Sequence, residues 1–175
     1  SLRGFRRMFL LSQEVEAYPS LAQSLQQTQV PIKEGYYVIE STTPYVDTIT
    51  GKTRGLISLL LLADSSCAEC YDINIHKQMF GRMGLAIADE KNVDISSEEG
   101  KALVKKYQIM NVPTSILTGD IDSYDFFKQI WQQAGSVEND GAYVFRHLSV
   151  LGPGVKYKDL KDGKIVEETW IAKVY

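Results

Sequence analysis

The chain has 175 residues, of which 44% are hydrophobic and 23% are charged, and its formal net charge at pH 7 is -3. This is enough apolar material for one globular core with an appended element, but not for two full domains. A net negative charge and a sequence pI near 5.4 give no general attraction to phosphate backbones, which argues against nucleic acid as a partner. The longest apolar run, Leu56–Ala63, has the length of a strand and is too short to span a bilayer as a helix.

The N-terminal segment has two interpretations. Because the first residue is Ser1 rather than Met, we expect a processed chain or one that lacks its original N-terminus, and a membrane tether outside the given sequence is compatible with this. Arg3, Arg6 and Arg7 are followed by the apolar Met8–Leu11. Such a segment suits either the neighbourhood of a membrane or the start of a short amphipathic helix.

The first predicted elements are a helix and a strand. Residues 15–29 are rich in Gln, Ala, Leu and Ser and predict a helix that ends at Val30-Pro31. Aromatic and β-branched residues in Gly35–Glu40 predict a strand, and Thr50-Gly51-Lys52 predicts a turn. The nearly unbroken apolar run over 57–63 is typical of a central strand that is covered on both faces.

Alternating helices and strands follow the cysteine pair at positions 67 and 70. Apolar residues at helical spacing predict a helix over 68–83, with glycines near its end. Ser97, which precedes two glutamates, is the expected N-cap of a later helix. This alternation predicts a mixed sheet with covered faces, and the fold class is therefore α/β. The remaining predicted elements are a strand supplied by 85–88 and 91–95, the capped helix through Lys106 and Tyr107, a strand over 111–117, a helix over 123–134, and strands over 142–146 and 164–170.

Two parts of the chain resemble one another weakly, and each has a helix before it. One interpretation is that residues 1–55 are the end of a preceding, truncated sister repeat, and the other is that two similar hairpins share the same turn chemistry. In both, we expect residues 1–55 to form an N-terminal helix and strand extension ahead of a main domain over residues 56–175. The matching segments are 34–39, 45–47 and 51–52 in the first part, and 140–145, 157–159 and 163–164 in the second.

The residues best suited to chemistry are those of Cys67-Ala68-Glu69-Cys70, which lie where a predicted buried strand meets a predicted helix. That placement puts the first sulfur beside free backbone N–H groups of the helix N-terminus, which stabilise a thiolate. Cys67 is then the catalytic nucleophile that forms a mixed disulfide with a partner, and Cys70, one helical turn further, resolves it. The alternatives are a structural disulfide and half of a zinc site, but zinc usually needs four ligands and the chain has no third cysteine.

The order of elements around this pair resembles the thioredoxin superfamily. A strand, Cys67-x-x-Cys70, a helix, a strand and a helix are followed by residues 105–114, which end in Val112-Pro113-Thr114, a segment of the type found in that family. The resemblance covers roughly residues 56–118. It implies a thioredoxin-like mixed sheet flanked by helices for the domain over residues 56–175. It also implies a protein thiol-disulfide oxidoreductase, whose partners are protein thiols or disulfides and an unidentified electron donor or acceptor.

The same resemblance assigns a substrate-binding role to Val112 and Pro113. It implies a cis peptide bond between them that faces the cysteines, and a Val112 backbone that pairs with a bound peptide as a strand does. Without the resemblance, Pro113 is interpreted merely as a strand start. No cofactor and no metal is implied. We expect an extracytoplasmic location, periplasmic or at the cell surface, with the cytoplasm as the alternative because cysteine pairs of this kind occur there too.

The residues around the cysteines depart from thioredoxin itself. Ser66 stands where thioredoxin has an aromatic residue, Ala68 and Glu69 stand where it has Gly-Pro, and Leu61 stands where it has a buried acid. Ser66, Ala68 and Glu69 are therefore expected to modulate the site. Glu69 is expected to disfavour a thiolate at the first cysteine by like-charge repulsion.

Other residues near the pair have alternative interpretations. Asp64 or Lys91 is a candidate to replace the missing acid and base functions, and surface solvation is the alternative for both. His76, Met79 and Met83 share a face of the predicted helix and, with the thiols, suit a copper-handling domain, for which core packing of the three side chains is the alternative. The unusual surroundings of the cysteines also allow a redox-inactive interaction module on the same scaffold.

Overall fold

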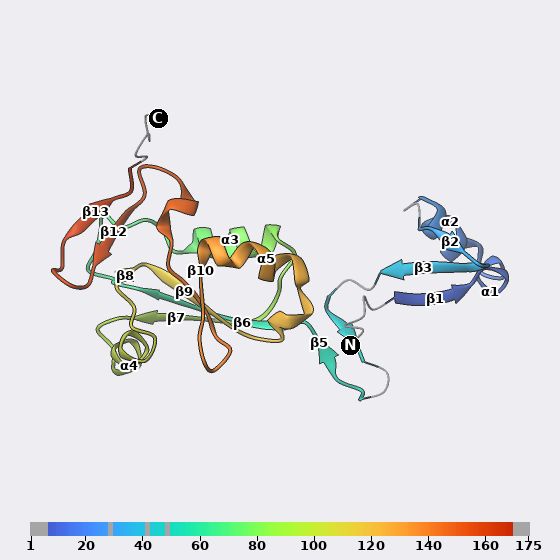
Figure 1. The fold of residues 1–175 in the computed structure, drawn as a ribbon, viewed down its shortest axis with the longest axis horizontal. Helices are drawn as coiled ribbons and strands as arrows, with labels where there is room; N and C mark the ends of the chain where they lie inside the picture. The colour runs from blue at the N-terminus through green and yellow to red at the C-terminus, as the bar shows by residue number, and fades with distance from the viewer. Residues whose placement is uncertain (1–6, 28–29, 41–42, 48–49, 170–175) are drawn as a thin grey trace. The chain divides into compact units, whose positions relative to one another are not determined.

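The computed structural model describes residues 7–27, 30–40, 43–47 and 50–169 (Figure 1). The chain divides into two compact units, Ser1–Tyr45 and Val46–Tyr175. Of the basic N-terminal residues, Arg3 and Arg6 lie outside the described residues, as does the end of the strand predicted over 164–170. No helix within the described ranges has the length and apolar character that crossing a membrane requires.

The first unit contains β1 (Arg7–Leu11), α1 (Ser12–Glu16), α2 (Pro19–Gln27), β2 (Ile32–Lys33) and β3 (Tyr36–Glu40). The strands form an antiparallel sheet in the order β1-β3-β2. Tyr37 on β3 packs against Val15 and Leu25 from the two helices, which makes a small core. The prediction of a single helix over 15–29 is wrong. Pro19 begins a new helix because proline suits the first helical position but lacks the N–H that a continuing helix needs.

A short hairpin of β4 (Tyr45–Val46) and β5 (Thr53–Arg54) follows in the chain. The N–H of Asp47 donates to the carbonyl oxygen of Lys52 at 2.9 Å, and Gly51 has a φ of 67°. Because a positive φ strains any residue with a Cβ, glycine fits this turn. The turn predicted at Thr50-Gly51-Lys52 is confirmed.

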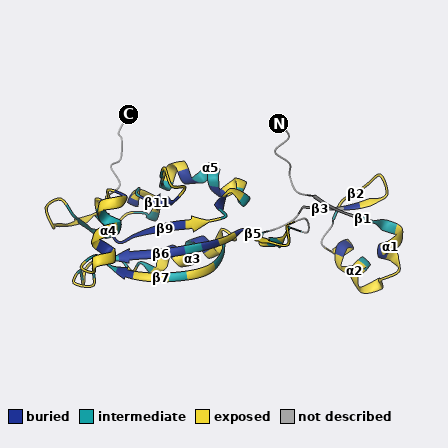
Figure 2. Cartoon of the chain, turned by 90° about the horizontal axis from the view of Figure 1, so that it is seen from below, coloured by how far each residue is buried: buried dark blue, intermediate teal, exposed yellow. Residues whose placement is uncertain are grey.

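The second unit is built on a sheet of β6 (Leu56–Ala63), β7 (Ala86–Asp94), β9 (Thr114–Gly119), β10 (Gly135–Val137) and β11 (Tyr143–Phe145). The order across the sheet is β10-β11-β9-β6-β7. Strands β6 and β7 run parallel, whereas β6 with β9, β9 with β11 and β11 with β10 run antiparallel. The predicted mixed α/β class is therefore confirmed. Figure 2 shows much of β6 and β9 in the colour of buried residues, and the short β11 is buried at every position.

Both faces of β6 are covered, as predicted. Ile57, Leu59 and Leu61 lie in a larger core that includes Phe80 from α3 (Asn74–Arg82) and Trp131 from α5 (Asp125–Ala134). Leu62 lies in a smaller core, against which side chains of α4 (Glu98–Lys106) pack. Figure 1 shows α3 and α5 together over one face of the sheet, with α4 over the other.

Ser97 determines where α4 begins, and two 3-10 turns lie next to α5 and β11 in the chain. Ser97 Oγ accepts a hydrogen bond from the N–H of Gly100 at 2.9 Å, so the predicted N-cap of α4 is confirmed. The helix predicted over 123–134 corresponds to α5, which follows a short 3-10 turn, η1 (Ile121–Ser123). A second 3-10 turn, η2 (Leu148–Leu151), follows β11.

A separate small sheet contains β8 (Asn111–Val112), β12 (Lys156–Asp159) and β13 (Ile165–Glu167), in the order β13-β12-β8. The strand predicted over 111–117 is therefore divided at Pro113 into β8 and β9, which belong to different sheets. Proline has no N–H to donate to a ladder, so the pairing partner changes there. The strand predicted over 164–170 corresponds to β13 within the described residues.

The two similar parts of the sequence have the same order of elements. In the first part β1 is followed by α2 and then by β2 and β3, and the strands pair in the order β1-β3-β2. In the second part β9 is followed by α5 and then by β10 and β11, and the strands pair in the equivalent order β9-β11-β10. Each run is followed by a hairpin, β4–β5 or β12–β13. In the second hairpin the N–H of Asp159 donates to the carbonyl oxygen of Lys164 at 2.9 Å and Gly163 has a φ of 74°, which matches the turn between β4 and β5.

Candidate functional site

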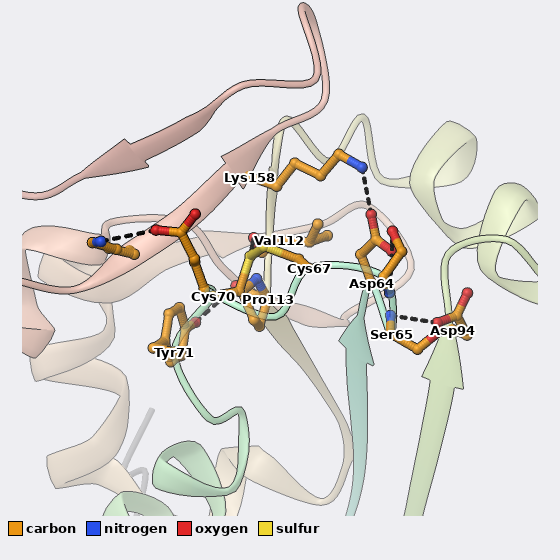
Figure 3. The surroundings of a disulfide bond; sticks show 12 residues. Asp64, Ser65, Cys67, Cys70, Tyr71, Asp94, Val112, Pro113 and Lys158 are labelled. Carbon is orange, nitrogen blue, oxygen red and sulfur yellow. Dashed lines mark hydrogen bonds and ion pairs between the residues drawn. A yellow bond between two sulfur atoms is a disulfide. The ribbon is translucent and has the colours of Figure 1, made fainter.

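The two cysteines form a disulfide on a turn that follows β6, with their Cα atoms 5.4 Å apart (Figure 3). Both are half-buried, and Ala68 and Glu69 between them are exposed. The N–H of Cys67 donates to the carbonyl oxygen of Asp64 at 3.0 Å, and the N–H of Cys70 donates to that of Cys67 at 3.3 Å. The disulfide is therefore held on a tight turn at the edge of the second unit, where solvent reaches it.

The expected contact between Cys67 and a helix N-terminus is wrong. Helix α3 begins at Asn74 rather than at residue 68. The carboxylate of Asp72 accepts hydrogen bonds from the N–H and the side-chain amide of Asn74, at 3.0 and 2.8 Å. Such a side-chain turn competes with helix for the backbone, so the helix starts after it. The thiolate of Cys67 therefore lacks the helix N–H groups that the sequence pattern predicts.

The Val112–Pro113 segment lies beside the disulfide, as the resemblance implies. The peptide bond between these residues is cis, and the carbonyl oxygen of Val112 lies 3.9 Å from Cys70 Sγ. Since Sγ carries no hydrogen in the disulfide, this is a contact and not a hydrogen bond. A reduced Cys70 thiol has a proton to donate to the same oxygen.

The backbone of Val112 already has a strand partner. Val112 on β8 lies opposite Lys158 on β12 in antiparallel register, and the N–H of Leu160 donates to the carbonyl oxygen of Met110 at 2.7 Å. Hydrogen-bonded pairs recur at every second position of an antiparallel ladder. The Val112 backbone, which is predicted to bind substrate, is therefore already paired with β12 of the protein's own hairpin.

Charged residues of this hairpin reach the cysteine turn. Lys158 Nζ lies 2.6 Å from Asp64 Oδ2, and Lys156 Nζ lies 3.0 Å from Glu69 Oε2. Figure 3 shows Lys158 extended toward Asp64 next to Cys67. The hydrogen bond from Lys158 lowers the pKa of the Asp64 carboxyl. Glu69 is thus paired with a cation, which offsets the repulsion that it was expected to exert on a thiolate.

The proposed stand-ins for the missing acid and base lie in different places. The side chain of Asp64 is only 7% exposed and accepts hydrogen bonds from the N–H and Oγ of Ser66, at 2.9 and 2.6 Å. Lys91 is exposed and pairs with Glu99 at 2.7 Å, away from the cysteines on β7. Leu61 belongs to the larger core beneath the turn. Of the two candidates, only Asp64 lies at the site.

A buried polar cluster stands behind the disulfide. Tyr71 Oη donates to the carbonyl oxygen of Pro113 at 2.7 Å and lies 2.9 Å from Nε2 of His76, whose Nδ1 lies 2.8 Å from Ser115 Oγ. Burial lowers the pKa of His76 to about 4 and raises the pKa of Tyr71 above its ordinary value. Sequence reasoning missed this cluster, although the position of Tyr71 directly after Cys70 was a local signal for it.

The copper interpretation does not fit these contacts. Both ring nitrogens of His76 have hydrogen-bonding partners, Met79 packs against the larger core, and Met83 lies at the surface. Across the described residues, no group of three or more His, Cys, Asp or Glu side chains is gathered in a way that would hold a metal ion. The alternative, core packing, is found for His76 and Met79 but not for Met83.

Comparisons with known proteins identify no relative: no family model, no curated protein and no solved structure matches the chain. The geometry around Cys67 and Cys70 is therefore the basis for assigning a function.

Proposed function

We propose that the protein is a thiol-disulfide oxidoreductase on a thioredoxin-like scaffold, in which Cys67 and Cys70 exchange electrons with thiols or disulfides of a partner protein. The observation that carries the proposal is a disulfide with CxxC spacing on a solvent-accessible turn, beside the Val112–Pro113 segment. A bridge between residues 67 and 70 closes a very short loop, and a disulfide that closes a short loop adds little stability. A purely structural role therefore explains this disulfide less well than a redox role.

The order of elements supports the scaffold. Strand β6, the cysteine turn, α3, β7, α4 and then Val112-Pro113 follow one another in the order that suggested the resemblance. Strand β6 lies between β7 and β9, so the turn leaves the sheet at an interior strand. Catalytic groups on loops that a rigid sheet positions are a common arrangement in proteins.

The exchange proceeds through a mixed disulfide. A thiolate of the partner attacks Cys67 Sγ, and the bond to Cys70 breaks with its electron pair on Cys70 Sγ, which takes up a proton. A second thiolate of the partner then attacks the partner sulfur of the mixed disulfide, and Cys67 leaves with its electron pair and is protonated. The partner has lost two electrons and two protons, which the cysteine pair has gained. The same steps in reverse reduce a disulfide of the partner.

The position of β12 determines how a partner reaches the sulfurs. A partner strand that pairs with Val112 must displace β12, because Lys158 occupies that register. The turn residues Ala68 and Glu69 are exposed without any such displacement. A partner thiol therefore has direct access from the side of Ala68 and Glu69.

Insulin reduction and oxidative refolding of a reduced substrate test the proposal. The unaltered protein is expected to accelerate one of these reactions, Cys67→Ser to lose the acceleration, and Cys70→Ser to accumulate a mixed disulfide that Cys67→Ser does not form. Equal rates for the unaltered protein and Cys67→Ser in both assays would reject the enzymatic assignment.

A second candidate function is an interaction module that has kept the scaffold without turnover. The pairing of Val112 with Lys158 and the absence of helix N–H groups at Cys67 favour it. In that case a bound protein partner is expected to bind equally well to the unaltered protein and to Cys67→Ser. The oxidoreductase proposal predicts instead that partner capture depends on Cys67.

A further inference from the structure

Three side chains that take no part in the exchange steps form a continuous hydrogen-bonded chain behind Cys70. Ser115 on β9, His76 on α3 and Tyr71 are linked at 2.8 and 2.9 Å, and the chain ends at the carbonyl oxygen of Pro113, 2.7 Å from Tyr71 Oη. His76 and Ser115 are both 0% exposed. A buried polar group without a hydrogen-bonding partner lowers the stability of the fold, so each of these hydrogen bonds contributes to stability.

Aromatic packing fixes the imidazole in the middle of the chain. The rings of Tyr71 and His76 stack with centroids 5.6 Å apart and an interplanar angle of 20°. Phe145 meets the His76 ring at 4.4 Å and Phe80 meets it at 6.1 Å, both edge-on. This enclosure excludes water, and it accounts for a pKa near 4, which keeps His76 neutral at neutral pH.

The direction of each hydrogen bond follows from counting protons. A neutral imidazole has one N–H donor and one acceptor nitrogen, and a tyrosine hydroxyl has one proton. The carbonyl oxygen of Pro113 can only accept, so Tyr71 O–H must donate to it. Tyr71 Oη then accepts from Nε2–H of His76, and Nδ1 accepts from Ser115 O–H. The opposite direction would place two oxygens without a proton 2.7 Å apart.

We propose that Tyr71, His76 and Ser115 are positioning residues that hold the Val112–Pro113 segment against the cysteine turn, so that the Val112 carbonyl accepts a hydrogen bond from Cys70 when the disulfide is reduced. This inference rests on the redox role proposed above for the pair. The link to the sulfur is the 3.9 Å separation between the Val112 oxygen and Cys70 Sγ. The single residue between the two carbonyls concerned is Pro113, whose ring restricts its φ.

The hydrogen bond discriminates between oxidation states. It exists only when Cys70 carries a proton, so it stabilises the dithiol relative to the disulfide. It also favours the thiol over the thiolate at Cys70. The positioning chain therefore makes the pair easier to reduce and keeps Cys70 protonated while Cys67 reacts.

The charged groups around the turn act on the same sulfurs and must stay constant in a test. They are Asp64 and Glu69 on the turn with Lys158 and Lys156 on β12, each joined in the ion pairs described above. Within the described residues their side chains form these ion pairs rather than hydrogen bonds to Tyr71, His76 or Ser115, and the one hydrogen bond between the two groups joins the N–H of Tyr71 to the carbonyl oxygen of Lys156 at 2.8 Å. Substitutions in the chain of three residues therefore leave these ion pairs in place.

The test measures the equilibrium between the cysteine pair and glutathione, in which two glutathione molecules give two electrons and two protons to the disulfide. Tyr71→Phe removes the donor to Pro113 and is expected to lower the equilibrium constant for reduction by about fivefold, the worth of one net hydrogen bond. In a Cys67→Ser background, Tyr71→Phe is also expected to move the pH profile of Cys70 alkylation to lower pH.

Tyr107→Phe is the matched control. Tyr107 is a buried tyrosine of the smaller core whose hydroxyl donates to Asp140 Oδ2 at 3.0 Å. It loses the same atom, but its hydroxyl bonds to Asp140 and not to any member of the Tyr71–His76–Ser115 chain or to Pro113, so it is expected to leave both readouts unchanged. Equal shifts in Tyr71→Phe and Tyr107→Phe, or no shift in either, would overturn the positioning role.

A second measurement needs no substitution. The ¹⁵N chemical shifts of His76 in the unaltered protein distinguish its tautomers, and the Nε2–H tautomer is expected between about pH 6 and pH 8. The Nδ1–H tautomer would contradict the inferred direction of these hydrogen bonds, because Tyr71 would then donate to His76 instead of Pro113. If the pair never exchanges with glutathione, the oxidoreductase proposal fails, and this tautomer decides separately whether the Tyr71–His76–Ser115 chain is arranged as inferred.

Discussion

The first unit with the β4–β5 hairpin that follows it, and the second half of the second unit, share one layout but differ in what surrounds it. Each has a helix, an antiparallel run of three strands and a hairpin closed by an Asp, a Gly and a Lys. In the first unit this layout has a core of Val15, Leu25 and Tyr37. In the second, β6 and β7 extend the sheet, and both faces have substantial cores. The shared layout favours a repeat over two unrelated hairpins.

The proposed thiol-disulfide exchange depends on elements of the second unit. Both cysteines of the chain lie on the turn that follows β6, a strand that the first unit does not contain among its described residues. The polar chain behind them uses Ser115 from β9 and His76 from α3, so it needs the completed sheet and its helix. The hairpin β12–β13 then contacts the cysteine turn through Lys156 and Lys158.

The largest expected difference concerns the cores. Phe80 is 0% exposed and its ring packs near those of Phe127 and Trp131, so Phe80→Ala is expected to lower the free energy of unfolding of the second unit by about 3–5 kcal/mol. Urea denaturation followed by tryptophan fluorescence measures this. Leu25→Ala, in the separate core of the first unit, is expected to leave that transition in place. A comparable shift from Leu25→Ala would contradict the division into two units.

The next effect concerns acid stability. His76 has a pKa of about 4 in the folded protein and about 6.5 when unfolded. Between these values the unfolded chain binds the proton more strongly, so stability falls as the pH drops from 6.5 to 4 and this contribution is constant below that. The loss is about 3 kcal/mol. Urea denaturation at several pH values measures it.

Two histidine variants sharpen this second prediction. His76→Gln is expected to remove the slope between pH 6.5 and about pH 5, whereas the same change at the exposed His147 is expected to retain it. Asp64 and Asp94 have lowered pKa values through hydrogen bonds, from Lys158 and from Ser96 and Ser65 respectively. Hydrogen bonds from Ser136 and Arg146 lower the pKa of Glu138 as well, and the contributions of these carboxyls are lost only below about pH 5, in every variant. A slope that survives in His76→Gln would show that another group causes it.

The smallest effect compares the two matched turns. Gly51 and Gly163 have φ values of 67° and 74°, and a Cβ at either meets no atom within 4 Å, so alanine introduces backbone strain alone. Each substitution is expected to cost about 1 kcal/mol, measured by urea denaturation. Gly163→Ala is also expected to change the rate at which dithiothreitol reduces the disulfide, since its hairpin carries Lys156 and Lys158. Gly51→Ala is the control. An equal change in the rate of disulfide reduction in this variant would contradict the proposed influence of β12 on the site.

The sequence predicts correctly those elements that depend on residues close together in the chain. The apolar run of β6, the Ser97 cap of α4 and the helix at α5 were each found from neighbouring residues. The position of Val112 beside Cys70 followed from the resemblance to a family, since the two residues are 42 positions apart in the sequence.

The parts that were not predicted depend on contacts between distant residues. The hydrogen bond between His76 and Ser115 joins residues 39 positions apart, and the ion pair between Lys158 and Asp64 joins residues 94 apart. Nothing in the periodicity of either segment shows such a partner. The start of α3 was misplaced for a different reason: apolar spacing continues through the turn, but the Asp72 side chain takes the N–H of Asn74.

A redox titration of Cys67 and Cys70 against glutathione or dithiothreitol buffers tests the central claim most directly. The oxidoreductase account predicts a reversible two-electron couple with a potential between about -120 and -270 mV, the range of proteins that exchange disulfides. A potential below about -300 mV, or a disulfide that does not equilibrate with either buffer, is typical of a structural bridge and would contradict the account.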